Sequence, residues 1–381
     1  MKVAQIIPCL GQNSGGPSRS VYELTKGLRS VNIDAEIITN NYLNNPNIAN
    51  ENWIRNNNIS RIYPFEYNPY FKQLLNRNEY DLFHIHSIYS YPVTFATRFA
   101  RKHHKPYIIA PRGSLYGNAI SSSSKWKKLL FNRLFLISDL NHASAIHATC
   151  IEEMEQIRLI GVTSPIAVIP NSITLPSIFP KISKTKKIRL CFLGRINPIK
   201  NIDGLIKAWY QSDMYKNKNA ELVIIGDAKL EKEKKHIKEL HELEQNLNIN
   251  NIVWTGNLIG SSKDALLNSC SYLILPSHSE NFGMVVVEAL IQGVPAITSK
   301  GTPWNILEEN KCGWWINNSV ESMAEYIKKI STISNAERED MGLKCQQLVK
   351  SEFSTPAVSQ RIKTLYSWIL EGGEKPDFVY L

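Results

Sequence analysis

Residues 272–290 read YLILPSHSENFGMVVVEAL and contain the turn from which the rest of the chain can be interpreted. The apolar run at 272–276 predicts a buried strand, and the apolar pattern that ends near Gly293 predicts a helix. Glu280 and Glu288 frame the turn between them. A helix N-terminus offers free backbone N–H groups, and Gly283 lets a ligand approach the backbone closely. The turn therefore suits an anionic ligand. A plain strand–glycine–helix turn with two solvated glutamates would have the same sequence pattern.

Length and composition indicate a globular protein of two domains. The chain has 381 residues, of which 43% are hydrophobic and 20% charged. No apolar run is long enough to span a membrane, no secretory signal follows Met1, and six isolated cysteines predict neither zinc nor disulfides. We therefore expect a cytoplasmic protein. The net charge of +10 favours anionic partners such as nucleotide diphosphates, nucleic acid or an acidic membrane surface, although solubility alone would explain it.

Two series of alternating strand and helix patterns predict two doubly wound α/β domains, at residues 1–180 and 187–355. Residues 174–187 carry prolines, serines and lysines without apolar periodicity and predict a linker. Ligands of doubly wound sheets bind outside the carboxyl ends of the strands. We therefore expect the two Rossmann-like domains to face each other across a cleft.

Glycine-rich and basic loops follow the first strand of each series. Gly15 and Gly16 precede the first helix, where the backbone could approach a bound group, but a simple tight turn would use the same residues. In the second series, Pro198 discourages helix between Arg195 and Lys200. The two cations can then converge on a diphosphate, for which a guanidinium and an ammonium are a suitable pair.

Polar residues also end strands of the first series. His84 and His86 alternate along one strand and so share a face, where hydrogen bonding is a simpler role than metal ligation because no third ligand is nearby. Arg112 follows the next strand and suggests a ligand or acceptor contact. No Asp-x-Asp pair occurs in the chain, so the usual carboxylate cradle for a metal–nucleotide complex is missing.

Together these pieces resemble the retaining glycosyltransferases of family 4, which have the two-domain fold called GT-B, and in particular the members that assemble bacterial surface polysaccharides. The family's hallmark is the spacing of seven residues between Glu280 and Glu288, with Arg195 and Lys200 upstream. The resemblance covers nearly the whole chain and extends to the segments at 81–87, 111–115, 169–171, 302–304 and 312–315.

The resemblance implies the roles of individual residues. Arg195, Lys200 and Glu280 would be catalytic, and Glu288 would hold the ribose hydroxyls. The implied donor-binding set is Gly15, Gly16, Arg195, Lys200, Glu280, Asn281, Phe282, Gly283, Met284 and Glu288. The implied sugar and acceptor region contains His86, Arg112 and Asn171. Members work without a bound metal or cofactor, and their last helix, here 356–381, crosses back onto the first domain.

The resemblance implies a hexosyltransferase that uses a nucleoside-diphosphate sugar, for which we expect uridine rather than guanosine diphosphate. Many members carry a histidine where this chain has Arg112, which puts a proton-transfer role there in doubt. Residues 121–136 interleave basic and apolar side chains and predict either a membrane-binding helix or a packed helix with a charged back. We favour an undecaprenyl-linked glycan acceptor and peripheral contact with the inner face of the cytoplasmic membrane.

Two other classes of function stay open. An isomerase acting on the nucleotide sugar would share the fold, and so would a non-catalytic protein that binds nucleotide sugars or glycans. The second would not need Glu280 and Glu288 together with Arg195 and Lys200. Nucleic-acid binding is not expected, because the basic residues are not gathered on a strand surface interleaved with aromatic side chains.

Overall fold

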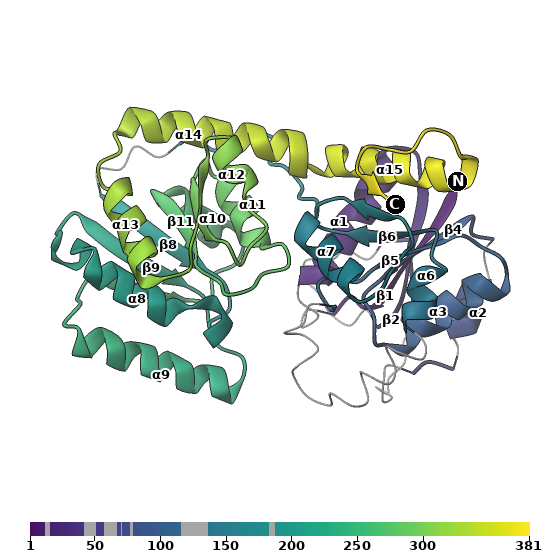
Figure 1. The fold of residues 1–381 in the computed structure, drawn as a ribbon, viewed down its shortest axis with the longest axis horizontal. Coiled ribbons are helices and arrows are strands. Elements are labelled where there is room, and N and C mark those ends of the chain that lie inside the picture. The colour runs from purple at the N-terminus through teal and green to yellow at the C-terminus, as the bar shows by residue number, and fades with distance from the viewer. Residues whose placement is uncertain are drawn as a thin grey trace. The chain divides into compact units, whose positions relative to one another are not determined.

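The structure is a computed structural model and divides into two compact units, Met1–Thr174 with Glu352–Leu381, and Leu175–Ser351 (Figure 1). It describes residues 1–11, 16–41, 51–56, 67–69, 71–76, 79–115, 136–182 and 187–381. We expected the boundary between residues 180 and 187, but it falls earlier. The carbonyls of Pro180 and Lys181 accept hydrogen bonds from the side chains of Gln346 (2.9 Å) and Asn268 (3.0 Å), which tie this stretch to the second unit.

The first unit has a sheet whose order over the described residues is β14-β7-β6-β5-β4-β1-β2-β3, with β14 antiparallel to β7. The chain moves outward from β1 to β3 and then returns to the other side of β1 as β4, so the crossover direction reverses between β1 and β4. The strands are β1 (Lys2–Cys9), β2 (Asp34–Asn41), β3 (Ile54–Asn56), β4 (Leu82–His86), β5 (Tyr107–Ala110), β6 (Ala145–Ala148), β7 (Ile166–Val168) and β14 (Val379–Tyr380). The described helices are α1 (Gly16–Ser30), α2 (Phe71–Asn76), α3 (Tyr91–Lys102), α6 (Ile137–Asn141), α7 (Ile151–Leu159) and α15 (Thr355–Glu371).

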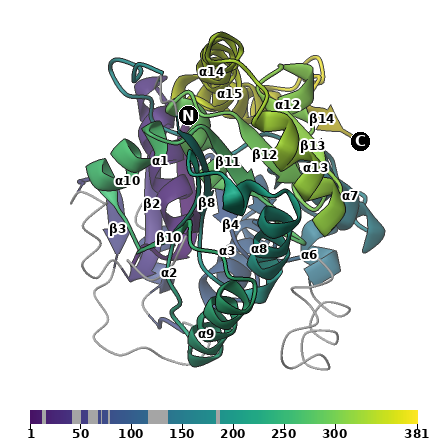
Figure 2. The ribbon, with the colours of Figure 1, turned by 90° about the vertical axis from the view of Figure 1, so that its left-hand side faces the viewer.

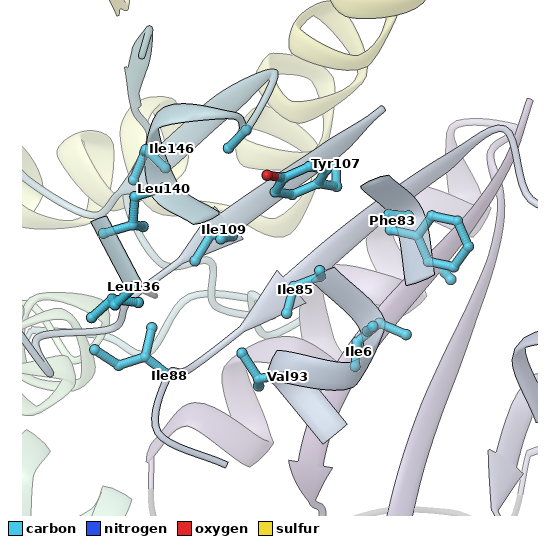
Figure 3. Packing of buried hydrophobic residues seen from close by; sticks show 14 of the residues in the cluster. Ile6, Phe83, Ile85, Ile88, Val93, Tyr107, Ile109, Leu136, Leu140 and Ile146 are labelled. Atoms are coloured by element: carbon cyan, nitrogen blue, oxygen red, sulfur yellow. The ribbon is translucent and has the colours of Figure 1, made fainter. Parts of the chain in front are cut away.

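Strand alternation sends neighbouring side chains of this sheet to opposite faces. Phe83 and Ile85 of β4 belong to the cluster covered by α2, α3, α6 and α7, where Figure 3 shows them with Val93 of α3 and Leu140 of α6. Leu82 belongs to the opposite cluster, covered by α1 and α15. His84 and His86 follow the parity of Leu82, so they lie on the face that the last helix covers.

The last helix packs directly on the first one, as Figure 1 shows for the yellow α15 beside α1. Gly27 of α1 makes this close approach possible. A Cβ atom at Gly27 would lie 2.2 Å from Ser359 Oγ and 2.3 Å from Thr355 Cγ2, both on α15. The apolar face predicted for the last helix is buried here through Ile362, Leu365 and other residues.

The second unit has an all-parallel sheet with the strand order β10-β9-β8-β11-β12-β13. The crossover direction reverses between β8 and β11, so the loops that follow these two strands lie at the switch point where doubly wound folds bind ligands. The strands are β8 (Ile188–Leu193), β9 (Ala220–Ile225), β10 (Ile252–Gly256), β11 (Tyr272–Leu275), β12 (Ala296–Ser299) and β13 (Gly313–Ile316).

Helices flank this second sheet, and Figure 2 shows α8 next to α9 and α13. The helices are α8 (Ile202–Gln211), α9 (Glu231–Asn246), α10 (Gly260–Asn268), α11 (Met284–Ile291), α12 (Ile306–Glu309), α13 (Val320–Ile330) and α14 (Asn335–Leu348). A 3-10 turn at Pro198–Lys200 precedes α8, and a π-helical turn at Val349–Phe353 follows α14.

The doubly wound α/β architecture predicted from the sequence is confirmed for both units. Among the described elements, the sequence did not predict β3, β13, β14, α2, α6, α7 or α12. Most of these are short and so carry little periodic signal. All six cysteines are free thiols. Within the described part of the chain, no helix combines the length and apolarity needed to cross a lipid bilayer.

Replacing Gly27 by leucine is expected to lower the free energy of unfolding by about 1–3 kcal/mol, because the added side chain must displace α15 from α1. Urea unfolding followed by circular dichroism would measure the change. The matched control is Lys26→Leu, which adds the same side chain at the neighbouring exposed position. Equal midpoints for the two variants would contradict the close packing of α1 on α15.

Candidate functional site

The loops that follow β8 and β11 are joined at the switch point of the second unit. The backbone N–H of His278 donates to the carbonyl of Ile199 at 2.8 Å. Asn201 adopts the left-handed conformation (φ 55°) between the 3-10 turn and α8, and its Nδ2 donates to Asn318 Oδ1 at 2.7 Å. Asn318 also contacts His278 Nδ1 at 3.0 Å. These contacts fix the two loops relative to each other.

Lys200 and Glu280 form an ion pair across these two loops, through Nζ and Oε2. The side chains are 15% and 20% exposed, so both charges are largely withdrawn from water while an edge of the pair stays accessible. Removing either partner would leave a mostly desolvated charge without compensation, which is costly. The pair is thus a preorganised polar site at the carboxyl ends of β8 and β11.

The turn into α11 requires its glycine. Gly283 has φ 79°, in the left-handed region, and a Cβ atom there would lie 3.1 Å from Glu280 Cγ. The buried Trp304 holds the same turn, since its indole N–H donates to the carbonyl of Phe282 at 2.6 Å and its ring packs against Phe282. Met284 begins α11, and Asn281 precedes Phe282 in the turn. Glu280 and the residues named with it by the sequence pattern therefore lie in one tightly held segment.

Glu288 lies in the second turn of α11 and has a partner that the sequence did not suggest. Lys263 of α10 approaches it, with Nζ 2.9 Å from Glu288 Oε1, and each side chain is 14% exposed. The sequence prediction missed Lys263 because α10 and α11 are adjacent only through the packing of the two helices on the sheet. The two glutamates of the hallmark spacing thus each face a lysine.

Arg195 and Lys200, which we expected to converge on one diphosphate, contact different carboxylates. Arg195 Nε lies 3.4 Å from Oε1 of Glu233 in the first turn of α9, and the arginine side chain is 55% exposed. Glu233 is buried and also accepts from the backbone N–H groups of Lys229 (2.9 Å) and Leu230 (3.1 Å). Burial by itself would raise the pKa of Glu233, but these hydrogen bonds and Arg195 lower it overall. Whether Arg195 and Lys200 share a ligand stays a prediction.

The glycine pair and the basic segment of the first unit are only partly covered by the structure. Gly16 begins α1, while Gly15 lies outside the described residues. In the basic amphipathic segment at 121–136, only Leu136 is described, where it is buried in the core of the first unit. The membrane-binding interpretation of that segment therefore stays a prediction.

His86, Arg112 and Asn171 form a hydrogen-bonded group at the carboxyl ends of β4, β5 and β7. Arg112 donates through Nη2 to His86 Nδ1 at 3.1 Å and through Nη1 to Asn171 Oδ1. Its backbone is left-handed, with φ 55°, which is unusual for a residue with a side chain and turns the guanidinium back over the strand ends. Burial lowers the pKa of Arg112 to about 10, so the guanidinium stays charged at neutral pH.

Two more histidines extend this group into the interior. The His84 and His86 rings lie 4.3 Å apart on one face, as the alternation predicted, and the ring of His147 lies 5.2 Å from that of His84. Burial, and then the neighbouring cationic or titratable groups, lowers the pKa of all three imidazoles, that of His147 to about 3. All three are therefore neutral at physiological pH.

Gln5, His147 and Tyr366 complete this group, and the sequence did not assign them a polar role. Gln5 bonds both His86 (2.7 Å) and Tyr366 (2.8 Å), and Tyr366 bonds His84 (2.7 Å). Tyr366 is separated from Gln5 by most of the chain and lies on the apolar face of α15, so no local pattern could signal the contact. The described residues contain no cluster of histidine, cysteine or carboxylate side chains arranged to hold a metal ion.

Comparison with known proteins identifies the class. Residues 14–175 match the family described as Glycosyltransferase Family 4, and residues 176–347 match Glycosyl transferases group 1. The two matches adjoin and take in both units. The chain belongs to the family 4 glycosyltransferases, and its pair of Rossmann-like units corresponds to the GT-B fold.

Two curated proteins illustrate the sequence relationship. The gpi3 subunit of phosphatidylinositol N-acetylglucosaminyltransferase from Schizosaccharomyces pombe is 24% identical over 83% of this chain and 64% of its own length. An uncharacterized 41.2 kDa protein in the cps region of Klebsiella pneumoniae is 25% identical over 59% of this chain and 62% of its own length. The chain thus spans less than two thirds of the length of each relative.

Solved structures share the fold at low identity. Sucrose-phosphate synthase from Thermosynechococcus elongatus has a TM-score of 0.76 at 16% identity, covering 98% of this chain and 100% of that one. HepE from Anabaena, in complex with UDP and glucose, has a TM-score of 0.71 at 17% identity, covering 96% and 99%. WaaG, a glycosyltransferase of lipopolysaccharide biosynthesis, has a TM-score of 0.65 at 14% identity, covering 97% and 100%.

The buried histidines are expected to make stability fall as the pH drops below about 6.5, the ordinary pKa of the imidazole in the unfolded chain. Below that pH the unfolded chain takes up protons that the folded one excludes, so each histidine can contribute a slope of about 1.4 kcal/mol per pH unit. For His147 the loss continues down to its folded pKa of about 3. Urea unfolding at a series of pH values would measure the slope.

His147→Gln should reduce this slope, while its control His142→Gln, at an exposed position of the same unit, should leave it unchanged. Carboxylates contribute equally to all three proteins and cancel in the differences. A His147→Gln slope equal to that of the parent protein would show that the imidazole is not held neutral in the fold.

Proposed function

We propose that this protein is a retaining glycosyltransferase that moves a hexose from a nucleoside-diphosphate sugar to a lipid-linked glycan in surface polysaccharide assembly. The observation that carries the proposal is the Lys200–Glu280 ion pair at the switch point of the second unit, with the Glu288–Lys263 pair on the helix that follows.

The adjacency of Lys200 and Glu280 fits the chemistry of a nucleotide sugar. In such a donor a single oxygen links the anomeric carbon to the β-phosphate, so groups that hold the diphosphate and the sugar hydroxyls must be close neighbours. The Lys200 ammonium has several N–H donors and can bridge Glu280 and a phosphate oxygen at once. Glu280 would accept from sugar hydroxyls, and Glu288, further along α11, from the ribose diol.

The proposed chemistry depends on stabilising the leaving group. When the bond from the anomeric carbon to the phosphate oxygen breaks, negative charge grows on the nucleoside diphosphate. A cation about 4 Å away, at an effective dielectric constant of about 20, attracts each unit charge by about 4 kcal/mol before desolvation. Lys200, Arg195 and the N–H groups at the start of α11 would supply this attraction without a metal ion. Retention would follow from attack by an acceptor hydroxyl on the same face, with no protein nucleophile, and the hydroxyl proton would pass to the departing phosphate oxygen.

The comparisons support the substrate classes in the proposal. HepE was solved with UDP and, separately, with UDP-glucose, which favours a uridine diphosphate donor. WaaG and the galactosyltransferase WaaB act in lipopolysaccharide assembly, and the Klebsiella relative is from a cps region. The net charge of +10 is consistent with an anionic lipid-linked acceptor at the inner face of the cytoplasmic membrane.

A thermal-shift screen with uridine and guanosine diphosphate sugars should stabilise the parent protein, with the larger shift for a uridine donor. Glu288→Ala should lose most of that shift, because the ribose diol loses its acceptor and Lys263 loses its partner. The control is Glu325→Ala, which removes an exposed carboxylate from the same unit. An unchanged shift in Glu288→Ala would remove the ribose role from this residue.

The membrane part of the proposal has its own test. The protein should float with liposomes that contain anionic phospholipid at low salt, and binding should fall as salt screens the charges. Neutral phosphatidylcholine liposomes are the control. Failure to bind anionic liposomes at low salt would contradict the peripheral location and leave the donor chemistry unaffected.

A further inference from the structure

A continuous hydrogen-bond chain crosses the interior of the first unit and ends at Arg112. It lies on the sheet face that α15 covers, and its contacts measure 3.1, 2.7, 2.8, 2.7, 3.2 and 2.9 Å in order. Its members in order are Arg112, His86, Gln5, Tyr366, His84, His147 and the carbonyl of Ile169.

The donor and acceptor of each hydrogen bond between Tyr366 and Ile169 follow from the Ile169 carbonyl at the inner end. The Ile169 oxygen can only accept, so Nε2 of His147 must carry a proton. His147 is neutral, which leaves its Nδ1 bare and able only to accept from Nε2–H of His84. His84 then has a bare Nδ1, which accepts the hydroxyl proton of Tyr366. The tautomers of both histidines and the rotation of the tyrosine hydroxyl are thereby fixed.

The outer half continues in the same direction. Tyr366 has used its proton, so its oxygen accepts from Nε2 of Gln5, and the amide oxygen of Gln5 therefore faces His86. Nε2 of His86 donates to that oxygen, which leaves Nδ1 bare to accept from Nη2 of Arg112. All the hydrogen bonds are therefore donated in one direction, from Arg112 toward the carbonyl of Ile169, and each of the three histidines is protonated on Nε2.

The Arg112 guanidinium at the end of this chain forms no ion pair with the described residues, although the Glu153 carboxylate acts on it through space and raises its pKa against the larger effect of burial. Both terminal nitrogens of Arg112 donate to neutral acceptors, and its buried Nε–H has no hydrogen-bond partner among the described residues. The Glu153 carboxylate is already engaged by the N–H of Gly113 (2.6 Å) and by the N–H and hydroxyl of Thr149 (2.7 Å each). A partly buried charge on a left-handed backbone, with a buried Nε–H that has no acceptor and no carboxylate hydrogen-bonded to it, is costly unless a ligand supplies an acceptor.

We propose that Arg112 binds an oxyanion of the substrate, a phosphate or a carboxylate, and that the hydrogen-bond chain through Tyr366 holds the guanidinium in the orientation that receives it. Asn171 and His86 fix two corners of the guanidinium plane and leave its remaining N–H bonds for the ligand. Arg112 is the binding residue, and Tyr366 on the last helix is a positioning residue that acts through Gln5 and His86.

The inference deepens the proposed function and rests on it only for the source of the anion. The oxyanion could belong to the donor diphosphate, to the phosphate of an isoprenyl-linked acceptor or to an acidic sugar of the glycan. UDP, farnesyl phosphate and glucuronate represent these sources. UDP binding that disappears in Glu288→Ala reports on the proposed donor site, so that result is separate from any effect of Arg112.

The first experiment follows the Nε–H resonance of Arg112 in protein labelled with 15N-arginine, assigned by its absence in Arg112→Gln. At least one probe should shift this resonance, and Arg112→Gln should bind that probe about tenfold more weakly or worse, as loss of a charge-assisted hydrogen bond predicts. Lys102→Gln, an equal charge change at an exposed position of the same unit, should bind it like the parent protein. The probe that responds identifies the source.

The result that overturns the anion site is an Arg112 resonance unmoved by all three probes, with affinities in Arg112→Gln within about twofold of the parent protein. This result would be informative even if the parent protein bound no UDP, because farnesyl phosphate and glucuronate test Arg112 without the donor site.

The second experiment tests the chain itself. Long-range 1H–15N spectra should show His84, His86 and His147 as Nε2–H tautomers, and Tyr366→Phe should perturb His84 and weaken the responding probe severalfold. Tyr107→Phe is the matched control, since it deletes another buried hydroxyl that donates to a carbonyl, that of Asp139, in the same unit. It should lower thermal stability comparably without weakening the probe.

Two outcomes would overturn the positioning role. One is a different tautomer at any of the three histidines. The other is a probe affinity and an Arg112 resonance that respond alike to Tyr366→Phe and Tyr107→Phe, because that would mean that loss of stability alone accounts for the effect.

Discussion

The hydrogen bond from the N–H of His278 to the carbonyl of Ile199 is the constraint on which the site of the second unit depends. It joins the loops that follow β8 and β11, the two adjacent strands between which the crossover direction reverses. Because of this join, Lys200 and Glu280 meet although eighty positions separate them in the chain. The turn into α11 is then held from the other side by Gly283 and Trp304.

The acidic residues at this site are each neutralised by a basic one. Glu280 contacts Lys200 and Glu288 contacts Lys263, so both carboxylates of this site are held in ion pairs. Such pairs hold partly buried side chains in a fixed geometry, which is what a site for a charged donor needs. The group around Arg112 in the first unit differs, because the side chains that hydrogen-bond to its guanidinium, His86 and Asn171, are neutral.

The last helix contributes both to the packing of the first unit and to its buried polar group. α15 returns to a sheet built from the beginning of the chain, and the close approach at Gly27 lets it lie flat on α1. Most of its inner face is apolar, but Tyr366 places one hydroxyl among the polar side chains that alternate along β1 and β4. The same helix therefore completes the core and the hydrogen-bond chain that holds His86.

The sequence by itself determined the alternation of strands and helices, the doubly wound class, the family and the turn that carries Glu280 and Glu288. These properties depend on local periodicity and on spacing within one strand–turn–helix unit, which a sequence displays directly. The ion pairs of Lys200 with Glu280, of Lys263 with Glu288 and of Arg195 with Glu233 depend on which loops and helices the fold brings side by side. The hydrogen bond between Tyr366 and His84 likewise depends on the packing of the last helix on the first sheet. Such contacts join residues far apart in the chain, and only the tertiary structure brings them within hydrogen-bonding distance.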